Sequence, residues 1–142
     1  MKAVILAAGI GKRLRGYFDK PKCLLEINGK SLINAYLHEL RRLGVEDTVV
    51  VVGYKKDVII EEVKRLGIPG KVIFVENPDY SKGSILSLCA ARKEFNDDII
   101  LMDGDVYFES EVLSRIIKSK YADCLLIDRN YKNDGEAMIA GI

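Results

Sequence analysis

Residues 2–14, KAVILAAGIGKRL, are the stretch that decides the fold of this chain. The apolar run at 2–7 has no polar alternation and predicts a buried strand. It leads directly into the turn Gly9-Ile10-Gly11 and then into two cations, Lys12 and Arg13. Because ligands of parallel α/β sheets bind beyond the carboxyl ends of the strands, this glycine turn is a candidate binding site.

Apolar runs alternate with amphipathic stretches along the rest of the chain, which predicts further strands separated by helices. Ser31 is the expected N-cap of the first helix, and Gly44 its end. An Asn28-Gly29 turn after Cys23–Ile27 predicts a small side element. We expect helices at 31–43, 56–66, 83–94 and 110–119, and strands at 47–52, 71–75, 98–102 and 122–127. This order predicts a three-layer α/β/α domain whose parallel sheet is covered on both faces.

The composition limits the possible classes of protein. A length of 142 residues suits one domain with a real core, and 49% hydrophobic and 30% charged residues indicate a globular chain. The 22 Lys and Arg against 21 Asp and Glu give a net charge of +1, so no global field favours nucleic acid or an anionic membrane. No apolar stretch approaches the length of a membrane span or forms a signal peptide. The widely spaced Cys23, Cys89 and Cys124 predict reduced thiols in a cytoplasmic protein.

Three interpretations of the glycine turn compete. A dinucleotide fingerprint needs a third glycine where Leu14 stands. A Walker P-loop needs glycine at Leu6 and Ser or Thr at Arg13. A plain turn with solvated charges remains open as well. The position of the glycine turn directly after the first strand favours phosphate binding. Glycine exposes backbone N–H groups to phosphate oxygens, and the Arg13 guanidinium can bind a phosphate with two hydrogen bonds.

Two later motifs add charge that suits a nucleotide site. Pro21-Lys22 follows the turn, although it could be only a bend in a loop. Asp103 and Asp105 flank Gly104, and residues two apart in an extended segment point the same way. Paired carboxylates suit Mg²⁺, which keeps several waters and shares substrate phosphates. Helix capping and solvation are the alternative for these aspartates.

These motifs together resemble the N-terminal signature of the sugar-phosphate nucleotidyltransferases, also called nucleoside-diphosphate-sugar pyrophosphorylases. The resemblance runs through LAAGIGKRL (6–14), PKCLLEINGKSLI (21–33) and DGD (103–105). It implies a Rossmann-like, GT-A-like nucleotidyltransferase domain. It also implies transfer of a nucleotidyl group to a phosphomonoester with release of pyrophosphate, assisted by Mg²⁺.

The resemblance also implies roles for single residues. Arg13 would hold the β- and γ-phosphates, and Lys22 would contact the α-phosphate and the attacking phosphate. Lys12 stands where the family often has Thr or Ser, so its contact with the nucleotide is the least defined. Asp105 would be a metal ligand. The remaining expected nucleotide-binding residues are Leu6, Ala7, Ala8, Gly9, Gly11, Asn77, Gly83, Ser84 and Asp103.

The choice of substrate rests on finer likeness. Asn77 and the run at 83–88 look most similar to the phosphocholine and inositol-1-phosphate cytidylyltransferases, which favours CTP and a phosphorylated small alcohol or sugar. A uridylyltransferase or another sugar-1-phosphate enzyme stays open, as does a nucleotide-binding domain without turnover. Residues 136–142 resemble the start of another strand, which fits either a small complete domain with that strand at an edge or the N-terminal part of a longer chain; we expect the longer chain. In this family a second metal-binding aspartate usually lies farther along the chain. The acceptor and the oligomeric state are not determined by the sequence.

Overall fold

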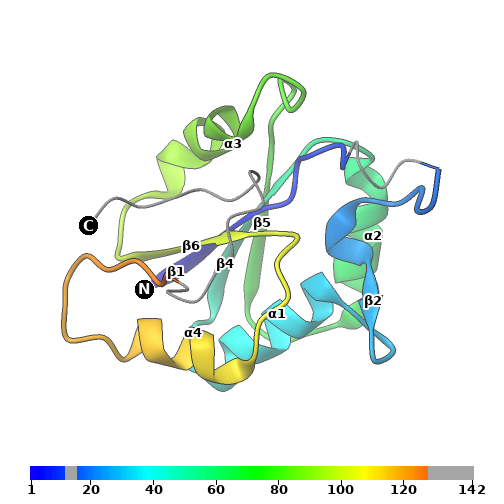
Figure 1. Cartoon of the computed structure of the whole chain (residues 1–142). Helices are drawn as coiled ribbons and strands as arrows, with labels where there is room; N and C mark the ends of the chain where they lie inside the picture. Colours follow the sequence, from blue (N-terminus) through cyan, green and yellow to red (C-terminus); the bar gives the residue numbers. More distant parts are fainter. Residues whose placement is uncertain (12–15, 128–142) are drawn as a thin grey trace. The chain divides into compact units, whose positions relative to one another are not determined.

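The computed structural model of the chain describes residues 1–11 and 16–127 (Figure 1). The chain forms two compact units, Met1–Tyr107 and Phe108–Ile142. All the described strands and the first three α-helices belong to the first unit, and one helix belongs to the second. The candidate motifs at 21–22 and 103–105 therefore lie in the same compact unit.

The first unit is built on a sheet of parallel strands. Its order is β5-β4-β1-β6, with β1 at Lys2–Leu6, β4 at Asp47–Val52, β5 at Lys71–Glu76 and β6 at Ile99–Asp103. Val4 of β1 is in register with Val49 on one side and with Leu101 on the other. The parallel sheet predicted from the apolar runs is confirmed, and each strand begins or ends within about two residues of its predicted bounds.

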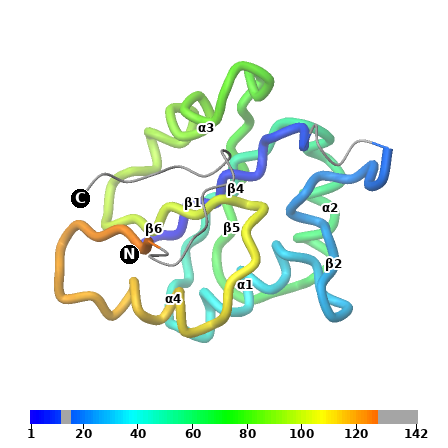
Figure 2. Tube along the Cα trace, viewed as in Figure 1, coloured from blue at the N-terminus to red at the C-terminus, as the bar shows by residue number. Residues whose placement is uncertain are grey.

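Helices join the strands and lie on both sides of the sheet. Helix α1 is Leu32–Arg42, α2 is Lys56–Leu66, and α3 is Ser84–Ala90, followed by the 3₁₀ helix η3 at Ala91–Glu94. Figures 1 and 2 show α1 and α2 on one side and α3 on the other. Right-handed crossovers explain this, because the chain moves outward from β1 to β5 and then returns across the sheet to β6.

The centre of the sheet is the core of the unit. Ala3, Val4 and Ile5 of β1 are fully buried, as are Val49–Val51 of β4. Strand β6 is less covered than the centre of the sheet, because Leu101 is 47% exposed and Ile99 is 37% exposed. Among the described residues β6 is an edge strand, and no helix of the unit covers these side chains fully.

A small hairpin connects the glycine turn to α1. A 3₁₀ helix, η2, at Lys22–Leu24 precedes strands β2 (Glu26–Ile27) and β3 (Lys30–Ser31). The turn between them places Asn28 and Gly29 at positive φ, 53° and 75°, as a two-residue hairpin turn requires. Ser31 caps α1 as predicted, because its hydroxyl accepts a hydrogen bond from the Asn34 N–H at 3.3 Å.

Two other predictions need correction. The helix expected at 83–94 is an α-helix only to Ala90 and then tightens into η3. The strand expected at 122–127 is absent, because no neighbouring strand of the described chain pairs with this segment, and Leu125 is 76% exposed. In the second unit α4 spans Ser110–Ile117. The expected strand start at 136–142 lies outside the described residues.

Candidate functional site

A cavity of about 300 Å³ opens where the strand order reverses. The chain leaves β1 toward β4 on one side, and later returns to place β6 on the other side. This arrangement separates the connections at the carboxyl ends of β1 and β6, which is where α/β sheets bind ligands. The cavity is lined by the glycine turn, η2, the loop before α3, and the end of β6. Its lining residues are Leu6, Ala7, Ala8, Gly9, Gly11, Lys22, Cys23, Tyr80, Ser81, Gly83, Ser84, Ser87, Asp103, Gly104 and Asp105.

The glycine turn is fixed to the sheet by backbone hydrogen bonds. The Ala7 N–H donates to the Val51 carbonyl at 2.8 Å, and the Ala8 carbonyl accepts from the Tyr54 N–H at 3.0 Å. Gly11 has φ of 67°, and a Cβ there would lie 2.9 Å from Cγ of Lys22. Gly11 is therefore needed for the stem of Lys22 as well as for the turn.

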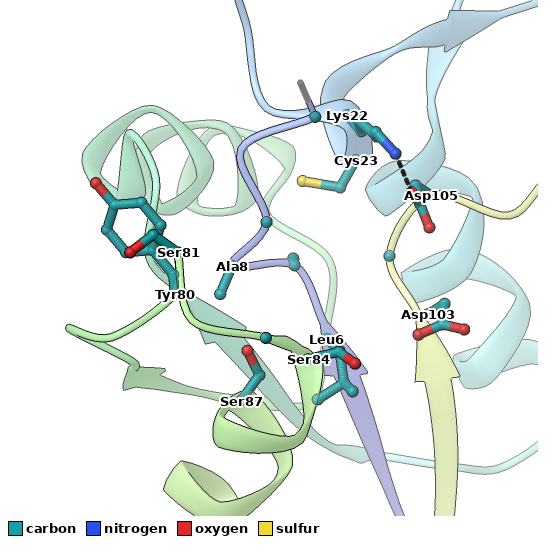
Figure 3. A pocket seen from close by; sticks show the side chains of 15 residues that line it. Leu6, Ala8, Lys22, Cys23, Tyr80, Ser81, Ser84, Ser87, Asp103 and Asp105 are labelled. Atoms are coloured by element: carbon teal, nitrogen blue, oxygen red, sulfur yellow. Dashed lines mark hydrogen bonds and ion pairs between the residues drawn. The ribbon is translucent and has the colours of Figure 1, made fainter. Parts of the chain in front are cut away.

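Lys22 contacts the segment that follows β6 on one side of the cavity. Its Nζ lies 2.6 Å from Oδ2 of Asp105 and donates a hydrogen bond to it (Figure 3). The two side chains are 32% and 39% exposed, so solvent reaches the pair and a ligand could as well. The structure thus brings together the lysine and the aspartate expected to hold phosphate and metal, although 83 positions separate them in the sequence.

Asp103 ends β6 and Asp105 follows two residues later, both on the same side of the cavity as Lys22 (Figure 3). Partial burial, and then the nearby Asp105 carboxylate, raise the pKa of Asp103 above its usual value. Gly104 between them donates its N–H to the Leu6 carbonyl at 2.9 Å. A Cβ at Gly104 would come within 2.7 Å of that carbonyl oxygen, so only glycine lets the two carboxylates approach the turn this closely.

An aromatic side chain from α1 holds the segment that follows these aspartates. The Tyr36 hydroxyl donates a hydrogen bond to the Val106 carbonyl, next to Asp105. Burial is the main cause that raises the pKa of Tyr36. The helix therefore fixes the backbone that carries Asp105.

The loop before α3 forms the opposite wall of the cavity. Tyr80, Ser81 and Ser84 lie across from Lys22 and Asp105, with the backbone of the glycine turn between them (Figure 3). The N-cap of α3 is Gly83, with φ of 130°, and no side chain caps it. The serine hydroxyls of this wall are consequently not used as the N-cap.

Asn77 lies behind that wall and does not line the cavity. It is only 2% exposed, and its amide donates to the Ser87 hydroxyl at 3.0 Å and accepts from the Asp79 N–H at 3.0 Å. Its observed contacts shape the loop, and its expected contact with the nucleotide stays a prediction. Lys12 and Arg13 lie outside the described residues, and their roles stay predictions too.

Five residues line the cavity that were not among the expected site residues: Cys23, Tyr80, Ser81, Ser87 and Gly104. Cys23 is 2% exposed, and burial raises the pKa of its thiol to about 12. A signal for Tyr80 existed in its position just before the Ser81–Ser84 run, whereas nothing local predicts the place of Cys23.

The oxygen atoms of Asp103 and Asp105 fit a hard divalent cation. Two carboxylates close enough for one to raise the pKa of the other lie in an open, partly solvated cavity, and Mg²⁺ is commonly bound by one or two carboxylates with water and phosphate. Within residues 1–11 and 16–127, no group of three or more His, Cys, Asp or Glu side chains forms a metal cluster. These two aspartates could hold Mg²⁺, and the expected role of Asp105 as a metal ligand stays a prediction.

Comparison with known proteins identifies the family of this chain. The MobA-like NTP transferase domain matches residues 3–139, nearly the whole chain. The chain belongs to the MobA-like NTP transferase family. This NTP transferase domain is 37% identical to the UTP–glucose-1-phosphate uridylyltransferase AglF of Haloferax volcanii over 126 residues, covering 87% of this chain and 50% of that protein. It is 29% identical to the choline-phosphate cytidylyltransferase of Streptococcus pneumoniae over 123 residues, covering 85% of this chain and 52% of the relative.

Solved structures agree on the fold. The inositol-1-phosphate CTP transferase from T. maritima has a TM-score of 0.66 and 31% identity, covering 81% of this chain and 47% of that one. The CTP:phosphocholine cytidylyltransferase from Streptococcus pneumoniae has a TM-score of 0.62 and 32% identity, covering 73% and 44%. The NTP transferase domain thus spans about half the length of these proteins. Among its described helices, none is both long and apolar enough to cross a membrane.

Proposed function

We propose that this chain forms the nucleotide-binding part of a nucleotidyltransferase. The reaction would transfer a nucleotidyl group, CMP from CTP, to a phosphorylated small alcohol or a sugar 1-phosphate, and would release pyrophosphate. The observation that carries this proposal is the cavity at the strand reversal, with Lys22 and Asp105 paired across one side and Gly9 and Gly11 beside them. Cytidylyltransferases among the relatives and solved structures support CTP.

The proposed chemistry needs position and positive charge, with no covalent intermediate. An oxygen of the acceptor phosphate would attack the α-phosphorus, while the bond from that phosphorus to the β-phosphate oxygen breaks and pyrophosphate leaves. Lys22 would leave Asp105 to contact the phosphates, and its ammonium group would stabilise the charge that develops there. Bound Mg²⁺ would supply further charge neutralisation, held by Asp103 and Asp105. Arg13 is proposed to bind the β- and γ-phosphates, as the resemblance implies.

A uridylyltransferase is the second candidate, and one specific observation favours it. The relative from Haloferax volcanii, at 37% identity, acts with UTP and glucose 1-phosphate by its name. Ser81 and Ser84 line the cavity wall formed by the loop before α3, and a serine hydroxyl offers both a donor and acceptors to a pyrimidine. The wall therefore suits either pyrimidine, and the base must be chosen by experiment.

Thermal stability with CTP, UTP, GTP and ATP, each with and without Mg²⁺, tests this proposal. A ligand at 100 times its dissociation constant adds about 2.7 kcal/mol to the free energy of unfolding. We expect a Mg²⁺-dependent rise in the melting temperature with one pyrimidine triphosphate, followed by pyrophosphate release when the acceptor is found. No rise with any triphosphate would overturn the proposal.

A further inference from the structure

The turn between β4 and α2, Gly53-Tyr54-Lys55, contains a backbone conformation that needs an explanation. Lys55 has φ of 47° and ψ of 43°, in the left-handed region, and it stands immediately before α2 without a side-chain cap. Lysine is not favoured there, because a side chain with a Cβ costs free energy in this region and glycine does not. A lysine at this position is consistent with a need for its side chain.

The Lys55 side chain reaches the segment that leads to Lys22. Its Nζ donates to the backbone carbonyl of Asp19 and lies 2.8 Å from the Asp19 carboxylate. The carboxylate is 92% exposed, so the ion pair alone contributes little. The contact with the backbone matters more, because Asp19 is three residues before Lys22 and the intervening Pro21 is buried.

The same turn contacts the opposite wall of the cavity. The Tyr54 ring packs against the Tyr80 ring, with centroids 6.4 Å apart and an angle of 58° between the planes. Gly53 lies against the same tyrosine, since a Cβ there would be 2.7 Å from the Tyr80 Cβ. Tyr80 lines the cavity, and Lys55 Nζ lies 5.5 Å from the centre of the Tyr54 ring.

The backbone of the turn also holds the floor of the cavity, through the hydrogen bond from the Tyr54 N–H to the Ala8 carbonyl. One short turn therefore touches the glycine turn, the approach to Lys22, and the wall formed by Tyr80. None of its own three residues lines the cavity, so it would act only through these neighbours.

We propose that Gly53-Tyr54-Lys55 is a positioning element of the nucleotide site and that Lys55 is a positioning residue for Lys22, an inference that rests on the function proposed above. By holding the backbone at Asp19, Lys55 limits where η2 can place the Lys22 ammonium group. Loss of Lys55 lets that group move away from the phosphates, and the protein stays folded.

Two substitutions separate this role from a structural one. Lys55→Met keeps the aliphatic stem and removes the charge, while Lys55→Gly removes the side chain and relieves the left-handed backbone. We expect Lys55→Gly to keep or raise the melting temperature, as glycine favours this conformation. Both variants should nevertheless weaken binding of the Mg²⁺-triphosphate that stabilises the wild-type protein, by about tenfold and up to about 100-fold, since small misplacements of such groups have large effects.

Lys56→Met is the matched control. Lys56 is adjacent, is exposed to a similar extent (37% against 34%), and pairs with Glu76 at 2.6 Å, away from the cavity. It should leave triphosphate binding unchanged. In a Lys22→Met background, Lys55→Met should cause no further loss, because its effect passes through Lys22.

Calorimetric titration of these variants with the selected triphosphate distinguishes the outcomes. Wild-type affinity in both Lys55 variants would overturn this inference and leave the proposed function standing. A full additional loss in the Lys22→Met background would overturn the claim that Lys55 acts through Lys22. Absence of triphosphate binding by the wild-type protein would overturn the proposed function, and this inference with it.

Discussion

Replacing Lys22 with methionine separates the chemistry of the site from its folding. Methionine has an unbranched side chain of similar length, so it can pack against Gly11 as the Cγ, Cδ and Cε atoms of Lys22 do. The substitution removes only the ammonium group. The lost contact is the ion pair with Asp105 at 2.6 Å. We therefore expect a fully folded protein that has lost the cation of its cavity.

The size of each effect follows from the exposure of the pair. At 32% and 39% exposed, these side chains form a solvent-screened pair, which contributes about 0–1 kcal/mol to the free energy of unfolding. In a domain of this size such a loss lowers the melting temperature by at most about 4 °C. A cation aimed at charge that develops in the transition state is worth far more, and its removal should lower kcat by roughly 100- to 1,000-fold.

The assay is the initial rate of pyrophosphate release by each variant, measured beside its thermal melt. Lys20→Met is the control, because it removes the same charge two residues earlier from a side chain that does not line the cavity. It should turn over like the wild-type protein. Rates like wild type in Lys22→Met would remove Lys22 from the mechanism, and a melting temperature that falls far more than 4 °C would contradict the energy assigned to the ion pair.

The remaining predictions concern packing and thiols. Gly104→Ala places a Cβ 2.7 Å from the Leu6 carbonyl oxygen. The urea midpoint should therefore fall by an amount equivalent to a loss of roughly 1–3 kcal/mol in the free energy of unfolding. An unchanged midpoint would show that the backbone moves aside without cost. At pH 8, Ellman's reagent should label Cys89 and Cys124 rapidly and Cys23 only after unfolding, because Cys23 is buried and its pKa is raised to about 12. Fast labelling of all three thiols in the native protein would contradict that burial. The folded protein thus holds the Cys23 proton more tightly than the unfolded chain does. This contribution to the free energy of unfolding is fully present below about pH 9 and falls as the pH rises toward 12. Between these pH values the urea midpoint of the wild-type protein should therefore decline, and Cys23→Ala should reduce that decline.

Much of the fold could be predicted because its signals are local. Strand β4 and helix α2 have the bounds expected from a β-branched run and from an amphipathic stretch that ends at Gly67. The Asn28-Gly29 turn formed the expected hairpin, since both positions need positive φ. The prediction of a strand at 122–127 was wrong because it depended on a non-local contact. An apolar run becomes a strand only where a neighbouring strand pairs with its backbone.

The candidate site divides in the same way. Its glycine turn, Lys22 and the paired aspartates were expected from spacing and family resemblance, since each motif is short and continuous; they line the cavity, and their roles stay predictions. The place of Cys23 in the cavity and the contact between Gly53 and Tyr80 could not be predicted, because they depend on how separate segments meet.

The sequence by itself determined the parallel α/β class, the position of the glycine turn after the first strand, and the residue types that suit phosphate and metal. Periodicity, turn chemistry and charge depend on residues that are close together in the sequence, so they can be read from the sequence alone. Only the tertiary structure decided that β6 returns beside β1, that Lys22 pairs with Asp105, and that Gly104 must be glycine. Those facts arise from long-range strand pairing, which brings distant residues within a few ångströms of each other and which no local pattern records.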